Sequence, residues 1–287
     1  MATGMVKPAK AGLWVDFGDT GRPADWYRAL QAGNTGGLGP VVGVILDCMT
    51  GGWPTDYQAA LDAGLEVMLF QGYWPNAWTG GPATATLRAA MAVRQAQQAG
   101  YPAGAILWLD SEAWPDTVTV DAWAQWINAW SAAIRDAGYV DGIYVGAGQP
   151  PGVTAQDLYQ RLSTQHYWRS ASAVPDVATR GYQIVQTRLD LEVAGYAVDL
   201  DTVHRDALGI LPPAVIPAAA APAQAAAPVP PDPVAALRQD VAALSAQVAA
   251  LSAQVVTRAA ITQWITEGLR QWSAGGGAPS GPSVPSN

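Results

Sequence analysis

The chain has 287 residues, of which 50% are hydrophobic, and it carries a formal net charge of -8 from 23 acidic and 15 basic residues. This apolar content and the 13 tryptophans suffice for a sizeable core and exclude a wholly disordered chain, and the acidic balance argues against a nucleic-acid partner. One cysteine and two histidines exclude a disulfide scaffold within the chain and multi-Cys or multi-His zinc sites, so we expect no metal and no cofactor, and chemistry that depends on carboxylates.

The start of the chain lacks the apolar run that is typical of a signal peptide, and residues 1–10 are expected to be a flexible terminus. No uninterrupted apolar stretch approaches the ~18 residues of a membrane span. Without an export signal, we expect a protein that is cytoplasmic until it is released, or one that is associated with a virion.

Eight short runs rich in Val, Ile and Leu alternate with helical patterns across residues 11–211, and the clearest helical pattern runs from Val120 to Gly138. Strands of this composition, most of them followed by a helix, indicate a parallel sheet that is covered on both faces. Eight such units fit a small (β/α)8 TIM-like barrel. A doubly wound open sheet is the alternative, although the glycine-rich phosphate-binding motifs are absent. The expected strands are 13–17, 41–47, 66–71, 105–110, 142–146, 166–168, 182–186 and 197–201.

Composition changes after this α/β region. Residues 212–233 contain eight prolines in 22 positions, which predicts an extended, semi-rigid Pro/Ala linker. Beyond it, Val and Leu alternate at an average spacing of about 3.5, the period of a coiled coil. We expect a coiled coil and an amphipathic helix over 234–274, associating as a dimer or trimer, and a disordered tail over 275–287. A helix that folds back on the α/β region is the alternative.

Acidic side chains concentrate where the expected strands end. Asp16 ends the first strand, Asp110 ends the fourth with Glu112 shortly after it, and Asp199 and Asp201 lie on the eighth. Charged residues at this rim of a barrel are typical of an active site. Asp110 and Glu112 are two positions apart, so they share a face if the strand extends that far. Two carboxyls close together in a low dielectric raise one pKa, which suits a general acid.

Polar and aromatic residues near other strand ends complete a candidate sugar site, because indoles offer an apolar stacking face and acids, amides and hydroxyls bind sugar hydroxyls. The alternatives are helix caps for the acids, core packing for the aromatics and a divalent cation, for which no loop signature exists. Cys48 is expected to be an inert buried thiol and His166 a structural residue. The candidates for substrate binding are Asp47, Gln71, Trp74, Trp114, Tyr144, Trp168, Gln186 and Asp201.

Several stretches together resemble a known family. They are LWVDF (13–17), LDAGLEVMLFQ (61–71), ILWLDSE (106–112), AGYVDGIYVG (137–146), HYWRSASAVP (166–175), RGYQIVQ (180–186) and AVDLD (197–201). With them, residues 11–211 resemble the bacterial and phage glycoside hydrolase-like domain of unknown function, a relative of the family 25 glycoside hydrolases, which are lysozyme-type muramidases. The first strand departs from the muramidase pattern, because it lacks the serine-tryptophan continuation.

The resemblance implies a barrel that acts on, or binds, cell-wall polysaccharide. It implies that Glu112 is the catalytic acid and that Asp110 is the companion that orients or stabilises the reacting N-acetyl group. Asp16 and Asp199 would complete the acidic cluster.

Two functions follow as hypotheses. The first is a glycosidase acting on peptidoglycan or a related polysaccharide, in which Glu112 protonates the leaving oxygen and Asp110 stabilises the oxocarbenium-like state. The second is a catalytically inert carbohydrate-binding or tail-associated virion module. The coiled coil would display that module as an oligomer and raise its avidity.

Overall fold

The computed structural model describes residues 4–35, 37–72 and 80–218, together with positions 263, 265–267 and 270. The chain divides into two units, Met1–Ala221 and Pro222–Asn287, and each is described by itself. In the second unit the described positions are helical and exposed. Most of the predicted linker and coiled coil, and the whole predicted tail, lie outside the described residues.

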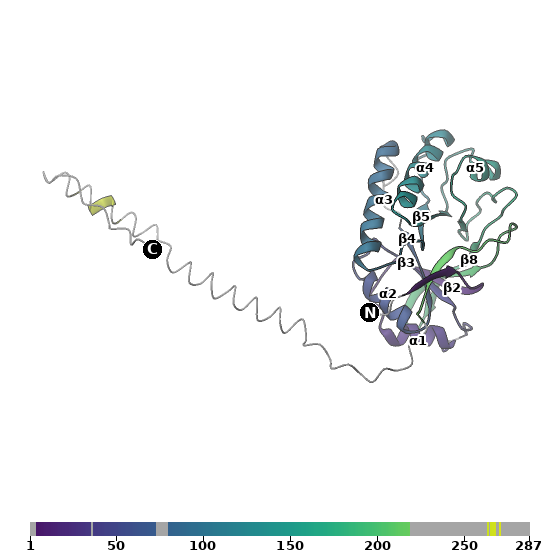
Figure 1. Cartoon of the computed structure of the whole chain (residues 1–287), viewed down its shortest axis with the longest axis horizontal. Helices are drawn as coiled ribbons and strands as arrows, with labels where there is room; N and C mark the ends of the chain where they lie inside the picture. The colour runs from purple at the N-terminus through teal and green to yellow at the C-terminus, as the bar shows by residue number, and fades with distance from the viewer. Residues whose placement is uncertain are drawn as a thin grey trace. The chain divides into compact units, whose positions relative to one another are not determined.

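Eight strands of the first unit form a closed barrel, and helices lie on its outer side (Figure 1). The strands β2 to β8 run parallel in chain order, and β9 closes the barrel by pairing antiparallel with both β8 and β2. Each predicted strand overlaps one of them, which confirms the barrel and excludes the open sheet. The strands are β2 (Gly12–Phe17), β3 (Gly43–Asp47), β4 (Glu66–Gln71), β5 (Ile106–Ser111), β6 (Val140–Val145), β7 (Tyr167–Arg169), β8 (Ile184–Val193) and β9 (Tyr196–Val203).

In the described ranges of this unit, helices follow only the first five of these strands. They are α1 (Ala24–Ala32), α2 (Trp53–Asp62), α3 (Gly81–Gln98), α4 (Val120–Asp136) and α5 (Ala155–Gln160). The expectation of eight strand–helix units is therefore wrong for the last three strands. Between β8 and β9 the chain turns at Ala194 and Gly195, which have φ angles of 49° and 85°. Two successive positive φ angles make a tight hairpin, so the last strand runs antiparallel with no crossover helix.

Both ends of the unit add short strands outside the barrel. β1 (Met5–Pro8) pairs antiparallel with β10 (Pro213–Ile216), and Val215 of β10 pairs with Val67 of β4. The prediction of a flexible terminus over 1–10 is wrong for β1, and the prediction that the linker starts at residue 212 is wrong for β10. Proline is tolerated as the first residue of a strand, the position that Pro213 holds in β10, and the fully buried Val215 anchors this strand.

Apolar side chains form one core inside the barrel and another between the strands and the helices. Three tryptophans of α4, Trp123, Trp126 and Trp130, are all buried in the outer core. None of the helices in the described ranges is long and apolar enough to cross a membrane. In the inner core, Trp14 packs against Gly43 and Trp108 packs against Gly142, and each indole fills the space that a side chain at its glycine would need. An added Cβ would lie 2.5 Å from Trp14 Cζ3 at Gly43 and 2.3 Å from Trp108 Cε3 at Gly142.

We expect Gly142→Ala to lower the free energy of unfolding by about 1–3 kcal/mol, because the added methyl group overpacks the barrel interior against Trp108. Urea denaturation followed by tryptophan fluorescence measures this change. Gly39→Ala is the matched control, since an added Cβ there meets no atom within 4 Å. Equal unfolding midpoints for the two variants would contradict the tight packing at Gly142.

Candidate active site

A cavity of about 170 Å³ lies at the end of the barrel where the parallel strands finish. Four carboxylates border it: Asp16 from β2, Asp110 from β5, Glu112 directly after β5, and Asp199 from β9. Strand pairing sets Asp16 opposite Asp199. Acids that are far apart in the sequence therefore meet in one cavity. Its lining residues are Asp16, Phe70, Asp110, Glu112, Tyr144, Trp168, Gln186 and Asp199.

Glu112 lies half-buried beyond the end of β5, where two features of the neighbouring β6 segment hold it. The backbone N–H of Ala147 donates a hydrogen bond to its carboxylate. At Gly146, an added Cβ would lie 2.2 Å from Glu112 Oε2 and 2.5 Å from its Cβ. Glu112 can therefore occupy this place only because residue 146 has no side chain.

The segment that follows Glu112 is fixed by its backbone and by a buried indole. Ala113, with a φ of 52°, donates to the carbonyl of Ala147 at 2.8 Å. The indole of Trp114 donates to Ser111 Oγ at 3.0 Å and packs edge-on against Trp126. Trp114, a predicted sugar contact, does not line the cavity, and its observed contacts anchor this segment.

Gln186 of β8 connects two of the acids. Its Nε2 donates to Asp16 Oδ1 at 3.2 Å and to Asp199 Oδ2 at 2.9 Å. Its Oε1 accepts from Tyr144 OH at 3.0 Å and from the backbone N–H of Ala171 at 3.1 Å. Both ends of the amide are occupied, so its orientation is fixed, and Gln186 holds Asp16 and Asp199 in place.

Asp201 lies beneath this cavity and is fully buried. It accepts a hydrogen bond from Trp168 Nε1 at 2.8 Å and shares another with Asp16. Burial, and then the charge of Asp16, raise the pKa of Asp201 well above its usual range, which favours the protonated carboxyl and a hydrogen bond from it to Asp16. Burial also raises the pKa of Asp16 to about 7, against the lowering effect of the bond from Asp201.

The other carboxyls of the cavity are also easier to protonate than in water. Burial raises the pKa of Glu112, the N–H of Ala147 opposes this shift, and the charge of Asp199 adds to it. Burial raises the pKa of Asp199 as well, against the N–H of Asp190. A carboxyl that stays partly protonated toward neutral pH is what a general acid requires.

We expect Asp201→Asn to weaken the pH dependence of stability. Asp16 and Asp201 bind protons more tightly in the folded state than in the unfolded state. Their contribution to stability is therefore complete below pH 3.8, the ordinary pKa of an aspartate, and is lost as pH rises toward about 7, the raised pKa of Asp16. Asparagine keeps a donor toward Asp16 but does not titrate. Urea denaturation at several pH values between these limits measures the free energy of unfolding. As pH rises, this free energy should fall less for the variant than for wild type. An equal fall in both proteins would contradict a proton shared between Asp16 and Asp201.

Two other predicted substrate contacts, Asp47 and Gln71, are not among the described residues that line the cavity. Asp47 accepts from the backbone N–H groups of Met49 at 2.9 Å and Gly72 at 3.1 Å. Gln71 donates to the carbonyl of Arg88 at 3.0 Å and accepts from Trp130 Nε1 at 2.7 Å, which ties β4 to α3 and α4. Trp74 lies outside the described residues.

The sequence reasoning missed Phe70, which lines the cavity, and Gly146, which packs closely against Glu112. Phe70 packs edge-on against Trp168 with 6.0 Å between ring centroids. The alternation of β4 places Phe70 on the same face as Met68 of the inner core, and this signal could have revealed it. No local pattern marks Gly146, because its role depends on where Glu112 lies.

Neither Cys48 nor His166 is among the residues that line this cavity. Cys48 is buried, and burial raises the pKa of its thiol, which makes it unreactive. Burial lowers the pKa of His166. Within the described ranges, no three His, Cys, Asp or Glu side chains form a group that could hold a metal ion.

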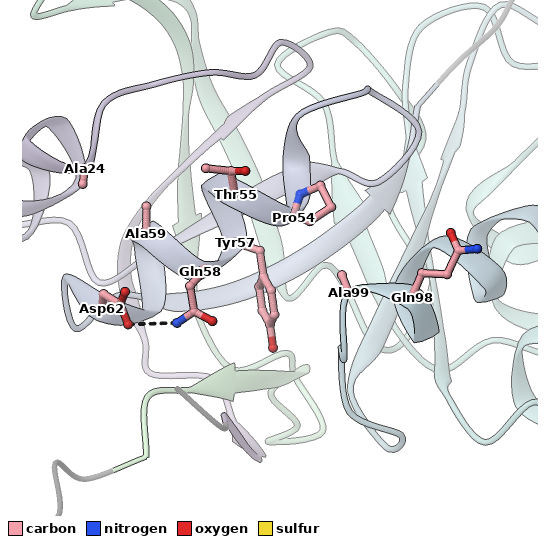
Figure 2. Close-up of a pocket in the computed structure, with 9 residues that line it drawn as sticks. All are labelled: Ala24, Pro54, Thr55, Tyr57, Gln58, Ala59, Asp62, Gln98 and Ala99. Carbon is pink, nitrogen blue, oxygen red and sulfur yellow. Dashed lines mark hydrogen bonds between the residues drawn. The ribbon is translucent and has the colours of Figure 1, made fainter. Parts of the chain in front are cut away.

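A larger hollow, of about 500 Å³, lies on the outer surface along α2 and beside the end of α3 (Figure 2). Pro54, Tyr57 and Gln98 are among its lining residues. Its one lining acid, Asp62, accepts from Gln58 Nε2 at 2.8 Å. This hollow lacks paired acids, so the smaller cavity is the candidate for chemistry.

A closed barrel that gathers carboxylates at the ends of its strands has the architecture of a glycoside hydrolase-like domain. The chain matches the Rv2525c-like, glycoside hydrolase-like domain over residues 52–207, more than half of its length, and it belongs to this family. The resemblance inferred from the sequence is thereby confirmed. No curated protein matches the chain by sequence.

Solved structures share the barrel at low sequence identity. An uncharacterized B. stearothermophilus protein is 21% identical, with a TM-score of 0.52 over 69% of this chain and 99% of that one. The Mycobacterium tuberculosis Tat-secreted protein Rv2525c, in complex with L-tartrate, is 16% identical, with a TM-score of 0.51 over 68% of this chain and 97% of that one. At these identities the likeness concerns the fold alone.

Proposed function

We propose that the protein is a glycoside hydrolase that cleaves peptidoglycan or a related cell-wall polysaccharide by carboxylate acid catalysis. The observation that carries this proposal is the meeting of Asp16, Asp110, Glu112 and Asp199 in one cavity. Membership of a glycoside hydrolase-like family supports the reaction class. The resemblance to muramidases supports the choice of substrate.

In this proposal Glu112 protonates the glycosidic oxygen as the bond breaks, because burial keeps its carboxyl protonated to a higher pH than in water. Asp110 stabilises the oxocarbenium-like charge, directly or through the substrate's N-acetyl group. Phe70 offers aromatic surface to the sugar ring, and the fully buried Trp168 packs edge-on against Phe70. Asp16 and Asp199, held by Gln186, complete the acidic cluster.

Incubation of the purified full chain with purified peptidoglycan tests the proposal. We expect soluble fragments and new reducing ends to appear with time. A protein that sediments with the wall fragments but releases no reducing ends would overturn the hydrolase and would leave a catalytically inert binding module.

We also propose that the Val and Leu repeat within 234–274 associates the chain as a dimer or trimer. Sedimentation of the full chain and of a chain ended after Ala221, which keeps β10, tests this association. The full chain should sediment as the oligomer and the shortened chain as a monomer. If the full chain and the shortened chain both sediment as monomers, self-association through this segment is contradicted.

A further inference from the structure

A second polar cavity lies on the outer side of the barrel at β7 and β8. The connection between these strands, residues 170–183, contains no helix to cover them. Trp168 and Ile184 belong to the core inside the barrel. The next residues, Arg169 and Val185, are paired across the two strands and therefore point outward. The cavity that they border has a volume of about 310 Å³.

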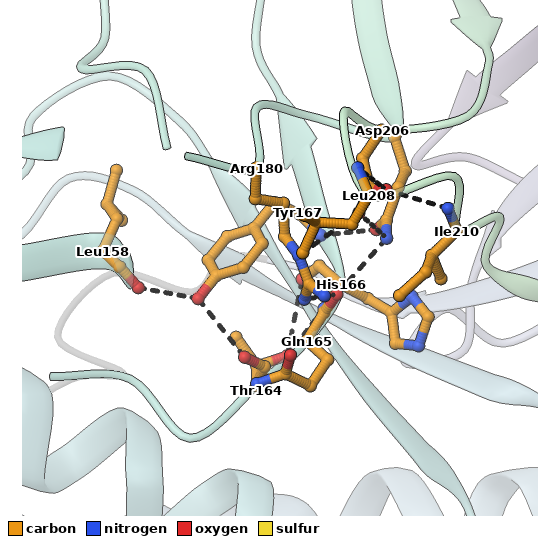
Figure 3. Close-up of polar contacts among 10 residues, drawn as sticks. Leu158, Thr164, Gln165, His166, Tyr167, Arg180, Asp206, Leu208 and Ile210 are labelled. Atoms are coloured by element: carbon orange, nitrogen blue, oxygen red, sulfur yellow. Dashed lines mark hydrogen bonds and ion pairs between the residues drawn. The ribbon is translucent and has the colours of Figure 1, made fainter. Parts of the chain in front are cut away.

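An ion pair fixes one wall of this outer cavity (Figure 3). The side chain of Arg180 is 3% exposed, and its Nε lies 3.2 Å from Asp206 Oδ2. Arg180 also donates to the carbonyl of Gln165. Asp206 accepts from Gln183 Nε2 at 2.9 Å and from two backbone N–H groups of the loop that follows it. Because Asp206 neutralises Arg180, this pair gives the wall rigidity without net charge.

Two more arginines border the cavity. Arg169 is half-buried at the end of β7, and Arg205 is exposed just after β9, where it donates to the carbonyl of Gly209 at 2.7 Å. Neither forms an ion pair with a carboxylate in the described part of the chain. His204 also lines the cavity, and the remaining acid, Asp176, accepts from the backbone N–H of the next residue.

The lining therefore carries three arginines against two aspartates, in a chain whose net charge is -8. A local excess of positive charge on an acidic protein attracts anions to this cavity. Guanidinium groups remain charged at every physiological pH and present a planar fork of donors that matches the oxygens of an oxyanion.

We propose that this outer cavity binds a phosphate group carried by a sugar or a glycan. A phosphate ester carries roughly -1.5 to -2 charges at neutral pH and three strong acceptor oxygens, so it can accept hydrogen bonds from both Arg169 and Arg205, whereas a carboxylate has one charge and two oxygens. A volume of about 310 Å³ leaves room for a sugar ring beside the phosphate. The cavity shares no lining residue with the carboxylate cavity, so the proposal does not depend on the hydrolase.

Isothermal titration calorimetry of the full chain with glucose 6-phosphate, inorganic phosphate, glucuronate and glucose tests this proposal. Glucose 6-phosphate should bind and glucose should not. Tighter binding of glucose 6-phosphate than of inorganic phosphate supports recognition of a phosphorylated sugar, and equal binding supports recognition of the phosphate alone. Glucuronate that binds as tightly as glucose 6-phosphate would overturn the choice of phosphate.

The variants Arg169→Gln and Arg205→Gln should each weaken the binding of glucose 6-phosphate by about tenfold, because each removes charge-assisted hydrogen bonds. Arg28→Gln, which removes an exposed arginine of α1 paired with Asp25, is the matched control and should bind as wild type does. Glu112→Gln should also retain full binding. The proposal would be overturned if glucose 6-phosphate did not bind the wild-type chain at about 10 mM. It would also be overturned if the folded Arg169→Gln and Arg205→Gln variants bound glucose 6-phosphate as tightly as wild type does.

Discussion

Glu112→Gln should abolish polysaccharide cleavage and leave the barrel folded. Glutamine keeps the size of the side chain and an oxygen that accepts the N–H of Ala147, but it cannot donate a proton to a leaving oxygen. Loss of a general acid lowers the rate by about 10²–10⁴-fold. The rate at which new reducing ends form on purified peptidoglycan measures this change directly.

The matched control is Asp136→Asn, which also converts a carboxyl to an amide. Asp136 is exposed at the C-terminal end of α4, away from the rim of the barrel that holds the acids. The Asp136→Asn variant should keep the wild-type rate of cleavage. The wild-type rate itself should fall as pH rises through the raised pKa of Glu112. A Glu112→Gln enzyme within tenfold of wild type would remove Glu112 from the catalytic role.

Gly146→Ala should also cost most of the activity, although the substituted residue carries no reactive group. The new Cβ would lie 2.2 Å from Glu112 Oε2, so the carboxyl group must move. A displacement of about 1 Å at a catalytic group costs on the order of 10²-fold in rate. Steady-state kinetics on soluble peptidoglycan fragments should show this loss in kcat.

Gly39→Ala serves again as control, since it adds the same methyl group where no atom lies within 4 Å. Circular dichroism should show that Gly146→Ala keeps its secondary structure. A folded Gly146→Ala variant with the activity of Gly39→Ala would show that the position of Glu112 does not matter for the reaction.

The barrel was predictable because its signal is local. Each strand is a short run of Val, Ile and Leu, and its length and flanking residues are legible without knowledge of its neighbours. The pairing of β1 with β10 was not predictable, because these strands lie at opposite ends of the unit and each has only four residues. β9 runs antiparallel because the chain turns tightly at Ala194 and Gly195. The sequence analysis expected a strand–helix unit there, and such a unit would have made this strand parallel.

The candidate site was predictable in part for the same reason. Barrel geometry brings acids at strand ends to one rim, so Asp16, Asp110 and Asp199 could be grouped from the sequence. However, the position of a residue at a strand end does not reveal with which group its side chain forms hydrogen bonds. Gln71 bonds to α3 and α4, and Asp47 bonds to backbone N–H groups, and these partners become visible only when the helices and loops are in place.

Digestion of purified peptidoglycan in water enriched in oxygen-18 tests most directly whether the acidic cavity hydrolyses glycosidic bonds. Mass spectrometry of the soluble fragments reports which bond has taken up the heavy oxygen. The wild-type chain should yield fragments with one heavy oxygen at a new reducing-end sugar, and Glu112→Gln should yield none. Undigested wall, or fragments with heavy oxygen only in peptide carboxyl groups, would contradict glycosidic cleavage by this protein.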